Sequence, residues 1–527
     1  MKKNIFLLFS LFATVLVVSA CGNNNNDTNA NLGTVENLDP TIPRWQQIEG
    51  RDELVTLTWF VNEGWWNTSW GDDFITRTIQ EMLNIEVEFI AGGEEELNLI
   101  FAAGDVPDIM TLSGGATTQT AQSADRWAYS LEELANRYDP YFFQVASMDT
   151  LNWLRLEDGG AYAYANFSNS WYDFDNGTIP ASTAFLIRRD IYEAIPGLNM
   201  TTPEGFLAGL EAISNQFPDV IPFGGVGNFG ADLQNLLGVP LLDADGNFHN
   251  RNLDPDYLTW LRTFRVAHDR GFINDDSFVN DGAIWDENIE FGNYATVIAG
   301  NLTGMSNVLQ RRFESFPGAE FIAIDGPAST VGNAPTLSQS GLSGWLLNHI
   351  AQGPNAAVAI ELFTFLLSDF GQRLTLFGVE GETFEINADG LIELAPHIQE
   401  MDGGERNDVY RFGEFFLLGH DRYRSLAAGT WVEAVHQPMA WGSNHLRPQF
   451  IIENINPEWG TLEARSLDAI NTEWNRIQIE LVRSSNDAEF DALIAEFEAF
   501  MANNNWDSIQ AIRNAGIEHN RGRLDRY

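Results

Sequence analysis

Lysine is almost absent from this chain. Among its 527 residues it occurs only at Lys2 and Lys3, so arginine supplies every other basic side chain. Lys and Arg together number 29 against 74 Asp and Glu, which gives a formal charge of −45 at pH 7. A surface this acidic disfavours nucleic acid and anionic lipid headgroups as general partners. We therefore predict that the protein has no nucleic-acid partner.

Cysteine is as scarce as lysine. Because Cys21 is the only cysteine, the chain cannot form an internal disulfide or build a metal site from cysteine ligands. His420, His436 and His445 also lack the i, i+4 spacing of a helical zinc site. The stretch 341–344 is one residue short of the G-x-S-x-G elbow of serine hydrolases. We predict no catalytic residues, no cofactor and no bound metal.

Two short motifs imitate cofactor and metal sites. Residues 225–230 fit G-x-G-x-x-G, but Pro222 interrupts the strand that a dinucleotide site needs before its glycines. Residues 243–247 begin like a calcium loop, yet Phe248 stands where an EF-hand requires glycine. An Asp-Gly hairpin turn explains this second stretch better than a calcium site does.

Long apolar runs are lacking too, apart from one near the start of the chain. Lys2 and Lys3 precede an apolar stretch over 5–18, which is too short for a typical spanning helix and has the layout of a secretory signal. The sequence Val18-Ser19-Ala20-Cys21 then matches the bacterial lipobox. We expect residues 1–20 to be a signal peptide and Cys21 to carry diacylglycerol, rather than to be a chance cysteine behind an ordinary signal.

The residues after Cys21 continue this pattern. The stretch 21–43 is polar and Asn-rich, so it cannot bury enough apolar area to fold. A flexible tether between a lipid and a folded body is the natural interpretation. It would hold the protein at the extracellular face of the cytoplasmic membrane.

The first folded stretch alternates strand and helix patterns. Its periodicity predicts a strand, a helix, a strand, a helix closed by Gly104 and a buried strand, at 54–61, 74–83, 85–89, 94–103 and 108–112. This β-α-β-α-β order requires a parallel sheet with right-handed crossovers. In such sheets ligands lie beyond the carboxyl ends of the strands, so the loop after the first strand is a candidate site.

Several segments carry the resemblance to one protein family. The run Leu97–Ile109 resembles the helix and Gly-Asp/Glu-x-Pro-Asp turn of the family 1 extracellular solute-binding proteins of bacterial ABC importers. Residues 184–213 resemble that family's hallmark, a strand ending in a basic-Asp pair before a Thr-x-x-(Glu/Asp)-aromatic helix start. Residues 257–273 and 294–304 resemble its next helix and a strand-turn that faces ligand.

The resemblance extends over about residues 54–515 and has two departures. Ile187-Arg188 replaces the Tyr-Asn that often precedes the basic-Asp pair, and Phe370 replaces the acid of a Ser-x-Glu-Gly-Gln turn. Residues 378–391 resemble a hairpin of the longer lipoprotein branch.

The resemblance implies an α/β protein of the periplasmic-binding type, class II-like, with two lobes. Each lobe would hold a parallel-core sheet flanked by helices, with the ligand cleft between the lobes. The first lobe is expected to hold 44–168 and 315–370, with 321–326 and 337–347 as returning strands. The second lobe is expected to hold 169–314 and 371–527.

The function implied is capture of an extracellular solute, foremost an oligosaccharide, by a monomer that delivers it to an ABC permease. Two alternatives stay open. One is a secreted glycan hydrolase, and the other is a receptor of the same fold for a peptide, an amino sugar or another solute.

Tryptophan is abundant, and several of the 16 lie in predicted loops. Aromatic faces stack on the apolar faces of sugar rings, while amide and carboxylate groups bond the hydroxyls. For each tryptophan the alternative is packing in the core. For the three that follow the first strand, Trp65, Trp66 and Trp70, we favour ligand binding over core packing. The candidate ligand-binding residues are Glu63, Trp65, Trp66, Trp70, Trp171, Asn301, Trp345, Trp431 and Trp441.

Overall fold

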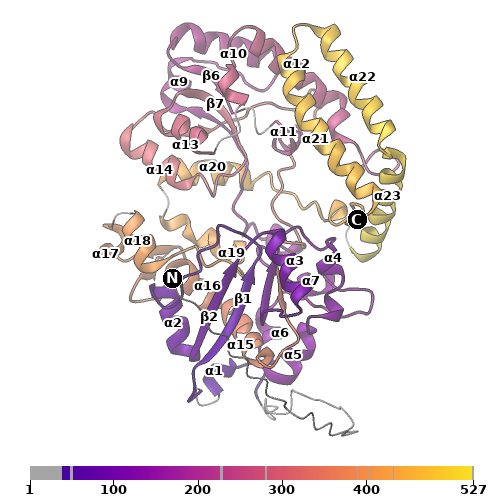
Figure 1. Cartoon of the computed structure of the whole chain (residues 1–527). Coiled ribbons are helices and arrows are strands. Elements are labelled where there is room, and N and C mark those ends of the chain that lie inside the picture. Colours follow the sequence, from indigo (N-terminus) through magenta and orange to yellow (C-terminus); the bar gives the residue numbers. More distant parts are fainter. Residues whose placement is uncertain are drawn as a thin grey trace, which may run out of the picture.

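The chain forms two lobes, each built around its own β sheet (Figure 1). This computed structural model describes residues 38–47, 51–225, 229–278, 282–388, 390–401, 403–430 and 432–524. The predictions for the signal peptide, for Cys21, for most of the tether and for Trp431 lie outside the described residues. The glycine motif at 225–230 is described only in part.

The first lobe begins with the β-α-β-α-β unit that the periodicity predicts. Its elements are β1 Val55–Val61, α2 Phe74–Leu83, β2 Ile85–Ala91, α3 Glu94–Ala103 and β3 Ile109–Leu112. β1 pairs in parallel with both β2 and β3, as expected. β9 Leu347–Ile350 pairs antiparallel with β3, and β4 Tyr164–Ala165 pairs antiparallel with β9, which completes a five-stranded sheet of order β2-β1-β3-β9-β4.

Local signals set the ends of these helices. Asp73 caps α2 by accepting a hydrogen bond from the Thr76 amide. Gly104 ends α3 with a φ of 71°, and its amide donates to the Ile100 carbonyl. This left-handed conformation is costly for residues with a Cβ, so glycine is the fitting residue there.

The core of the first lobe lies between the sheet and α15 Ala356–Leu367, which is buried along its whole length. Trp59 of β1 is fully buried, and its indole donates to the Thr111 hydroxyl at 2.8 Å. The other helices of this lobe are α1 Arg44–Gln47, α4 Gln119–Gln122, α5 Leu131–Tyr138, α6 Phe142–Val145, α7 Met148–Trp153, α16 Asp369–Phe377, α17 Pro396–Gln399, α18 Gly403–Tyr410 and α19 Asp421–Arg424. The expected hairpin near 378–391 is present as β10 Phe384–Ile386 and β11 Ile392–Leu394.

The second lobe holds a four-stranded sheet of order β6-β7-β5-β8. Its strands are β5 Ala184–Arg188, β6 Ile221–Gly224, β7 Tyr294–Ala299 and β8 Phe321–Ala323. Among the described strand pairs of this second sheet, β6 and β7 pair in parallel and the other two pairs are antiparallel. Thr202 caps α10 Pro203–Gln216 and Pro203 occupies its first turn, as the sequence predicts.

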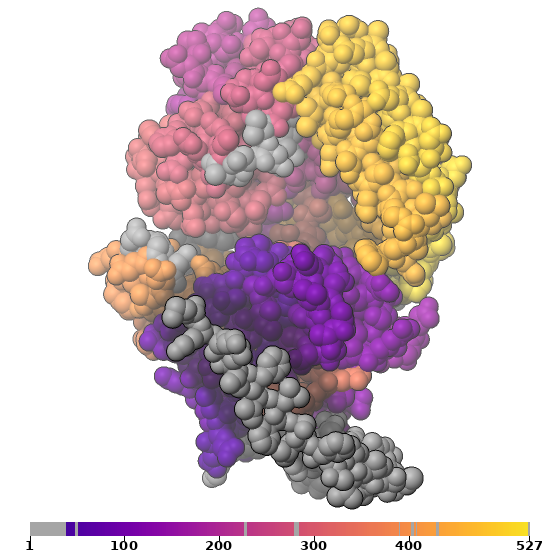
Figure 2. All heavy atoms as spheres, viewed as in Figure 1, coloured from indigo at the N-terminus to yellow at the C-terminus, as the bar shows by residue number. Residues whose placement is uncertain are grey.

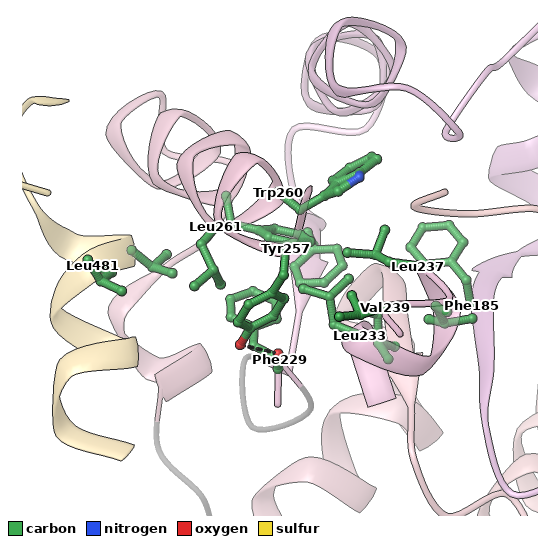
Figure 3. Packing of buried hydrophobic residues seen from close by; sticks show 14 of the residues in the cluster. Phe185, Phe229, Leu233, Leu237, Val239, Tyr257, Trp260, Leu261 and Leu481 are labelled. Atoms are coloured by element: carbon green, nitrogen blue, oxygen red, sulfur yellow. Dashed lines mark hydrogen bonds between the residues drawn. The ribbon is translucent and has the colours of Figure 1, made fainter. Parts of the chain in front are cut away.

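The core of the second lobe gathers aromatic side chains from several helices. Figure 3 shows Tyr257 of α12 Pro255–Asp269 beside Phe229, and Trp260 of the same helix and Leu233 of α11 Ala231–Leu236 belong to the same buried cluster. The Tyr257 hydroxyl donates to the Phe229 carbonyl at 2.8 Å. The remaining helices beside this sheet are α9 Arg189–Ala194, α13 Gly282–Phe291, α14 Ser306–Ser315 and α20 Glu433–Ser443.

Three long helices at the end of the chain cover one side of the second lobe (Figure 1). They are α21 Leu462–Arg483, α22 Asp487–Asn503 and α23 Trp506–Arg523. The last turn of α23 also reaches the first lobe, where Arg523 donates to the carbonyls of Asn152 and Trp153 at 2.7 Å each. This helix therefore contacts both lobes.

The structure corrects two parts of the predicted lobe division. Phe321–Ala323 pairs antiparallel with β5 in the second sheet instead of returning to the first lobe. Much of the chain after residue 370 stays with the first lobe, because α16 and the stretch around Phe415 pack into its core. Strand pairing decides the first point and core packing the second, and both join distant segments that carry no local mark of their partner.

A candidate ligand cleft between the lobes

A cavity of about 1210 Å³ lies between the two lobes. Its lower wall comes from the first lobe and includes Trp65, Trp345 and Phe416, while Asn301 and Asn307 belong to the upper wall. In Figure 2 the surface narrows between the pink second lobe and the orange and purple first lobe. The cavity is large enough for a ligand of several rings.

The lower wall carries a row of stacked aromatic rings with Phe416 at its centre. The Trp345 ring lies 5.7 Å from the Phe416 ring at an interplanar angle of 18°. Phe167 lies at 5.9 Å and 27°, and Trp65 at 6.2 Å and 30°. Trp65 is 61% exposed and Trp345 is 42% exposed, so both present apolar area to the cavity. We call these four residues the aromatic platform.

The rings of the platform are held by the segment that contains Phe416. Arg411 is 2% exposed and donates to the carbonyls of Ser69 and Asn67, at 2.8 and 2.6 Å, in the loop after β1. Glu63 in the same loop accepts a hydrogen bond from the Trp65 indole at 2.8 Å. Both contacts fix the loop that presents Trp65.

The upper wall is polar and belongs to the turn between β7 and α14. The Asn301 carboxamide accepts a hydrogen bond from the Gly304 amide at 3.1 Å, which closes the turn. A Cβ at Gly304 would lie 2.3 Å from the Asn301 amide nitrogen, so glycine keeps the turn tight. The hydroxyl and amide side chains that line this wall are Ser182, Asn301, Thr303, Ser306, Asn307 and Gln310.

The charged groups in the cavity balance one another. Among the described lining residues, Arg406 and Arg424 stand against Glu414 and Asp421. Arg424 pairs with the buried Asp421 at 3.1 Å, and its guanidinium lies over the Phe167 ring at 4.8 Å. Burial lowers the pKa of His420, opposed by Asp173, so this lining residue favours its neutral form at pH 7.

The structure brings together three of the predicted ligand-binding residues. Trp65, Asn301 and Trp345 all line the cavity, and Glu63 supports Trp65 from behind. Trp431 lies outside the described residues.

The other four predicted tryptophans do not line the cavity. Trp66 is 5% exposed and packs in the first-lobe core against Phe89 and Phe415. Trp70 packs against the same core, and its indole donates to Gln80 at 3.0 Å. Trp66 and Trp70 therefore pack with the core, which was the alternative to ligand binding for both.

Trp171 and Trp441 also pack against protein. The Trp171 ring meets the Phe450 ring edge-on at 5.0 Å. The Trp441 ring lies 4.7 Å from His445, and its indole donates to Asp325 at 3.3 Å.

Phe167 and Phe416, the two inner rings of the platform, are absent from the predicted set. A run of aromatic residues near Phe415 and Phe416 was the available signal, but no periodicity distinguished a ligand wall from a core. The Asp421–Arg424 pair was missed because 74 acidic residues leave no way to select one from the sequence.

Two absences hold for the described part of the chain. Within it, no group of three or more His, Cys, Asp or Glu side chains is gathered as metal ligands would be. None of its helices is long and apolar enough to cross a bilayer.

Comparison with solved structures identifies the fold. The alginate-binding protein AlgQ2, solved without calcium, matches with a TM-score of 0.64 and 16% identity over 89% of this chain and 99% of that one. An extracellular solute-binding protein from Bifidobacterium longum subsp. infantis gives 0.62 and 14%, over 89% and 99%. The S. pneumoniae protein FusA, in complex with kestose, gives 0.62 and 15%, over 89% and 100%.

These likenesses show that the chain has the fold of these solute-binding proteins. FusA is an ABC-transporter substrate binding protein, and AlgQ2 is an alginate-binding protein. No protein-family model matches the chain, and no curated protein sequence matches it. With identities of 16% or less, the match describes the fold and leaves the ligand to be argued from the cleft.

Proposed function

We propose that this protein captures an oligosaccharide in the cleft between its lobes and delivers it to an ABC permease. The aromatic platform supports this most directly. Its exposed faces, on Trp65 and Trp345, suit the apolar faces of sugar rings, and the opposite wall offers amides and hydroxyls for the sugar hydroxyls.

We further propose that the oligosaccharide is neutral. AlgQ2 binds alginate, whereas FusA was solved with kestose. In the present cleft two arginines face two carboxylates, so the described lining carries no surplus positive charge for a polyanion. The formal charge of −45 on the whole chain also repels an anionic glycan during approach.

A screen of ligands by thermal unfolding tests both proposals. A ligand that binds only the folded protein raises the unfolding midpoint. We expect neutral oligosaccharides of two to five units to raise it, and uronic-acid oligosaccharides of the same length to leave it unchanged. Peptides belong in the same screen, since a rise with peptides alone would favour the peptide-receptor alternative.

Binding without turnover distinguishes the proposal from the hydrolase alternative. The purified protein should leave the bound oligosaccharide intact after long incubation, as judged by chromatography of the sugar. Shorter sugars that accumulate in proportion to protein concentration would favour the hydrolase.

Delivery to a permease requires the lobes to close on the ligand. The chain crosses between the lobes along 166–183 and 324–346 and again before α20. A few residues in such connections can absorb a hinge rotation while both cores stay intact. We propose that the protein acts in this way as a monomer.

We also propose that lipid on Cys21 holds the protein at the outer face of the cytoplasmic membrane. The lipobox and the lone cysteine support this. Cys21→Ser should leave the protein in the medium or uncleaved, as cell fractionation will show. A variant that is processed and sediments with membranes like the wild type would rule out the anchor.

A further inference from the structure

A second cavity, of about 180 Å³, lies in the second lobe and shares no lining residue with the interlobe cleft. It is lined by the segment around the short 3-10 helix Arg251–Leu253 and by residues of α21, α22 and α23. Two of its lining residues are the arginines Arg251 and Arg513. Neither forms an ion pair with a described carboxylate, and the described side chains to which they donate are carboxamides.

Arg251 is poorly satisfied by the protein. One terminal nitrogen of its guanidinium donates to the Asn235 carboxamide at 2.8 Å. Its Nε is buried and has no hydrogen-bond partner among the described residues. The nearby Asp254 carboxylate is engaged with the His249 ring at 2.8 Å and with the first amides of α12. An unpaired buried donor costs about 1–3 kcal/mol, and more where the group is charged.

Arg513 faces the same cavity from α23. It is 9% exposed, and its Nε donates to the Asn456 carboxamide at 3.0 Å. Its guanidinium lies 4.3 Å from the centre of the Phe248 ring and 5.7 Å from that of Trp506. Burial lowers the pKa of Arg251 and of Arg513 to about 10, so both remain charged at pH 7.

The remaining polar lining adds further donors. Four carboxamides, those of Gln234, Asn250, Asn252 and Asn471, line the cavity. Gln234 donates to the Asn252 oxygen at 3.0 Å, which occupies an acceptor and leaves the Asn252 amino group available. The Asn250 amino group meets the Met501 sulfur at 3.6 Å, a weak acceptor. With two guanidinium groups and no carboxylate among its described lining residues, the cavity carries a net positive charge.

We propose that this cavity binds a small oxyanion of the size and charge of inorganic phosphate, with Arg251 and Arg513 as its cationic ligands. Guanidinium groups match oxyanions through parallel N–H bonds, and charge-assisted bonds of this kind are the stronger ones. A bound anion would neutralise the charges of both arginines and give the buried Nε of Arg251 a hydrogen-bond acceptor. It would also join the 248–253 segment to the three C-terminal helices.

Phosphate titration monitored by thermal unfolding tests the proposal on the full chain. Ionic strength is held constant with chloride, because phosphate also stabilises proteins in general by exclusion from their surface. We expect the wild-type midpoint to rise and to saturate with phosphate, since specific binding stabilises the folded state by mass action. Sulfate should act in the same way, and acetate more weakly.

Two variants and a control separate the site from a general salt effect. Arg251→Gln and Arg513→Gln should bind phosphate at least about tenfold more weakly, because each loses a charged ligand. Arg476→Gln is the control. Arg476 lies on α21 outside the cavity, and its substitution removes a surface cation that contacts three glutamates. That control should respond to phosphate like the wild type.

Equal midpoint rises in the wild type and both cavity variants would overturn the proposal. If the variants do not fold, equilibrium dialysis of the wild type against labelled phosphate decides instead. One phosphate retained per chain supports the site. The proposal is overturned if the protein retains no phosphate at about ten times the concentration at which the rise in unfolding midpoint saturates. Neither result depends on oligosaccharide binding, because the two cavities share no residues.

Discussion

At the scale of single residues, the neighbours Trp65 and Trp66 give the sharpest contrast. Trp65 is 61% exposed at the cavity, whereas Trp66 is 5% exposed in the core. We expect Trp65→Ala and Trp345→Ala to lower oligosaccharide affinity by about 2–4 kcal/mol, roughly 30-fold or more, with little change in stability. Trp66→Ala should instead lose about 3–5 kcal/mol of stability.

Calorimetric titration for affinity and denaturant unfolding for stability check this pair of outcomes. Trp66→Ala serves as the matched control, because it deletes the same side chain one position away. Unchanged affinity in both Trp65→Ala and Trp345→Ala would show that the platform does not touch the ligand.

Asp139, at the end of α5, makes stability depend on pH. Burial, together with the nearby Glu361 carboxylate, raises the pKa of Asp139 to about 7. The folded state therefore holds a proton that the unfolded state releases near pH 4. Between these values the folded state binds more protons, so the contribution of Asp139 to stability falls as the pH rises from about 4 to 7.

Asp139→Asn should remove this dependence. Relative to the wild type, the variant should gain about 3 kcal/mol of stability between pH 5 and pH 8, because about two of the roughly three pKa units of the shift lie in this interval. Urea unfolding of both proteins at the two pH values measures the difference. A stability difference between variant and wild type that is the same at both pH values would contradict the assigned pKa.

At the scale of elements, the end of α3 offers a test of backbone conformation. Gly104 has a φ of 71°, and the space that a methyl group would occupy on its Cα is open, so only backbone strain opposes a side chain there. Gly104→Ala should therefore cost about 1 kcal/mol. Gly64→Ala is the control, because Gly64 has the same open space without a positive φ. Equal stabilities of the two variants, measured by urea unfolding, would show that α3 does not need glycine at its end.

Elements with strong local signals were predictable from the sequence. The β-α-β-α-β unit follows from periodicity and from caps such as Asp73 and Gly104, and its parallel pairing follows from chain connectivity. The lobe of β8 was not predictable, because its three residues pair with β5 more than 100 positions away.

The candidate site was predictable in part for the same reason. Trp65 follows the first strand directly, so the topological rule for open sheets applies to it, whereas Asn301 was expected from the resemblance of residues 294–304 to a strand and turn that face ligand. Phe416 reaches the platform only because Arg411 fixes its segment against the loop after β1. That contact joins residues more than 340 positions apart, and no local pattern marks it.

At the scale of the whole molecule, the proposed function depends on where the oligosaccharide lies. The cleft joins an aromatic wall of the first lobe to a polar wall of the second, and only a ligand between them contacts both. Such a ligand would also favour the closed arrangement of the lobes, because it gains contacts as they approach.

A crystal structure of the protein with the neutral oligosaccharide that raises the unfolding midpoint most tests this claim directly. We predict a sugar ring stacked on Trp345 or Trp65, with hydroxyls bonded to the turn that contains Asn301. An oligosaccharide bound outside the interlobe cavity, or bound within it without contact to either tryptophan, would contradict the proposed function.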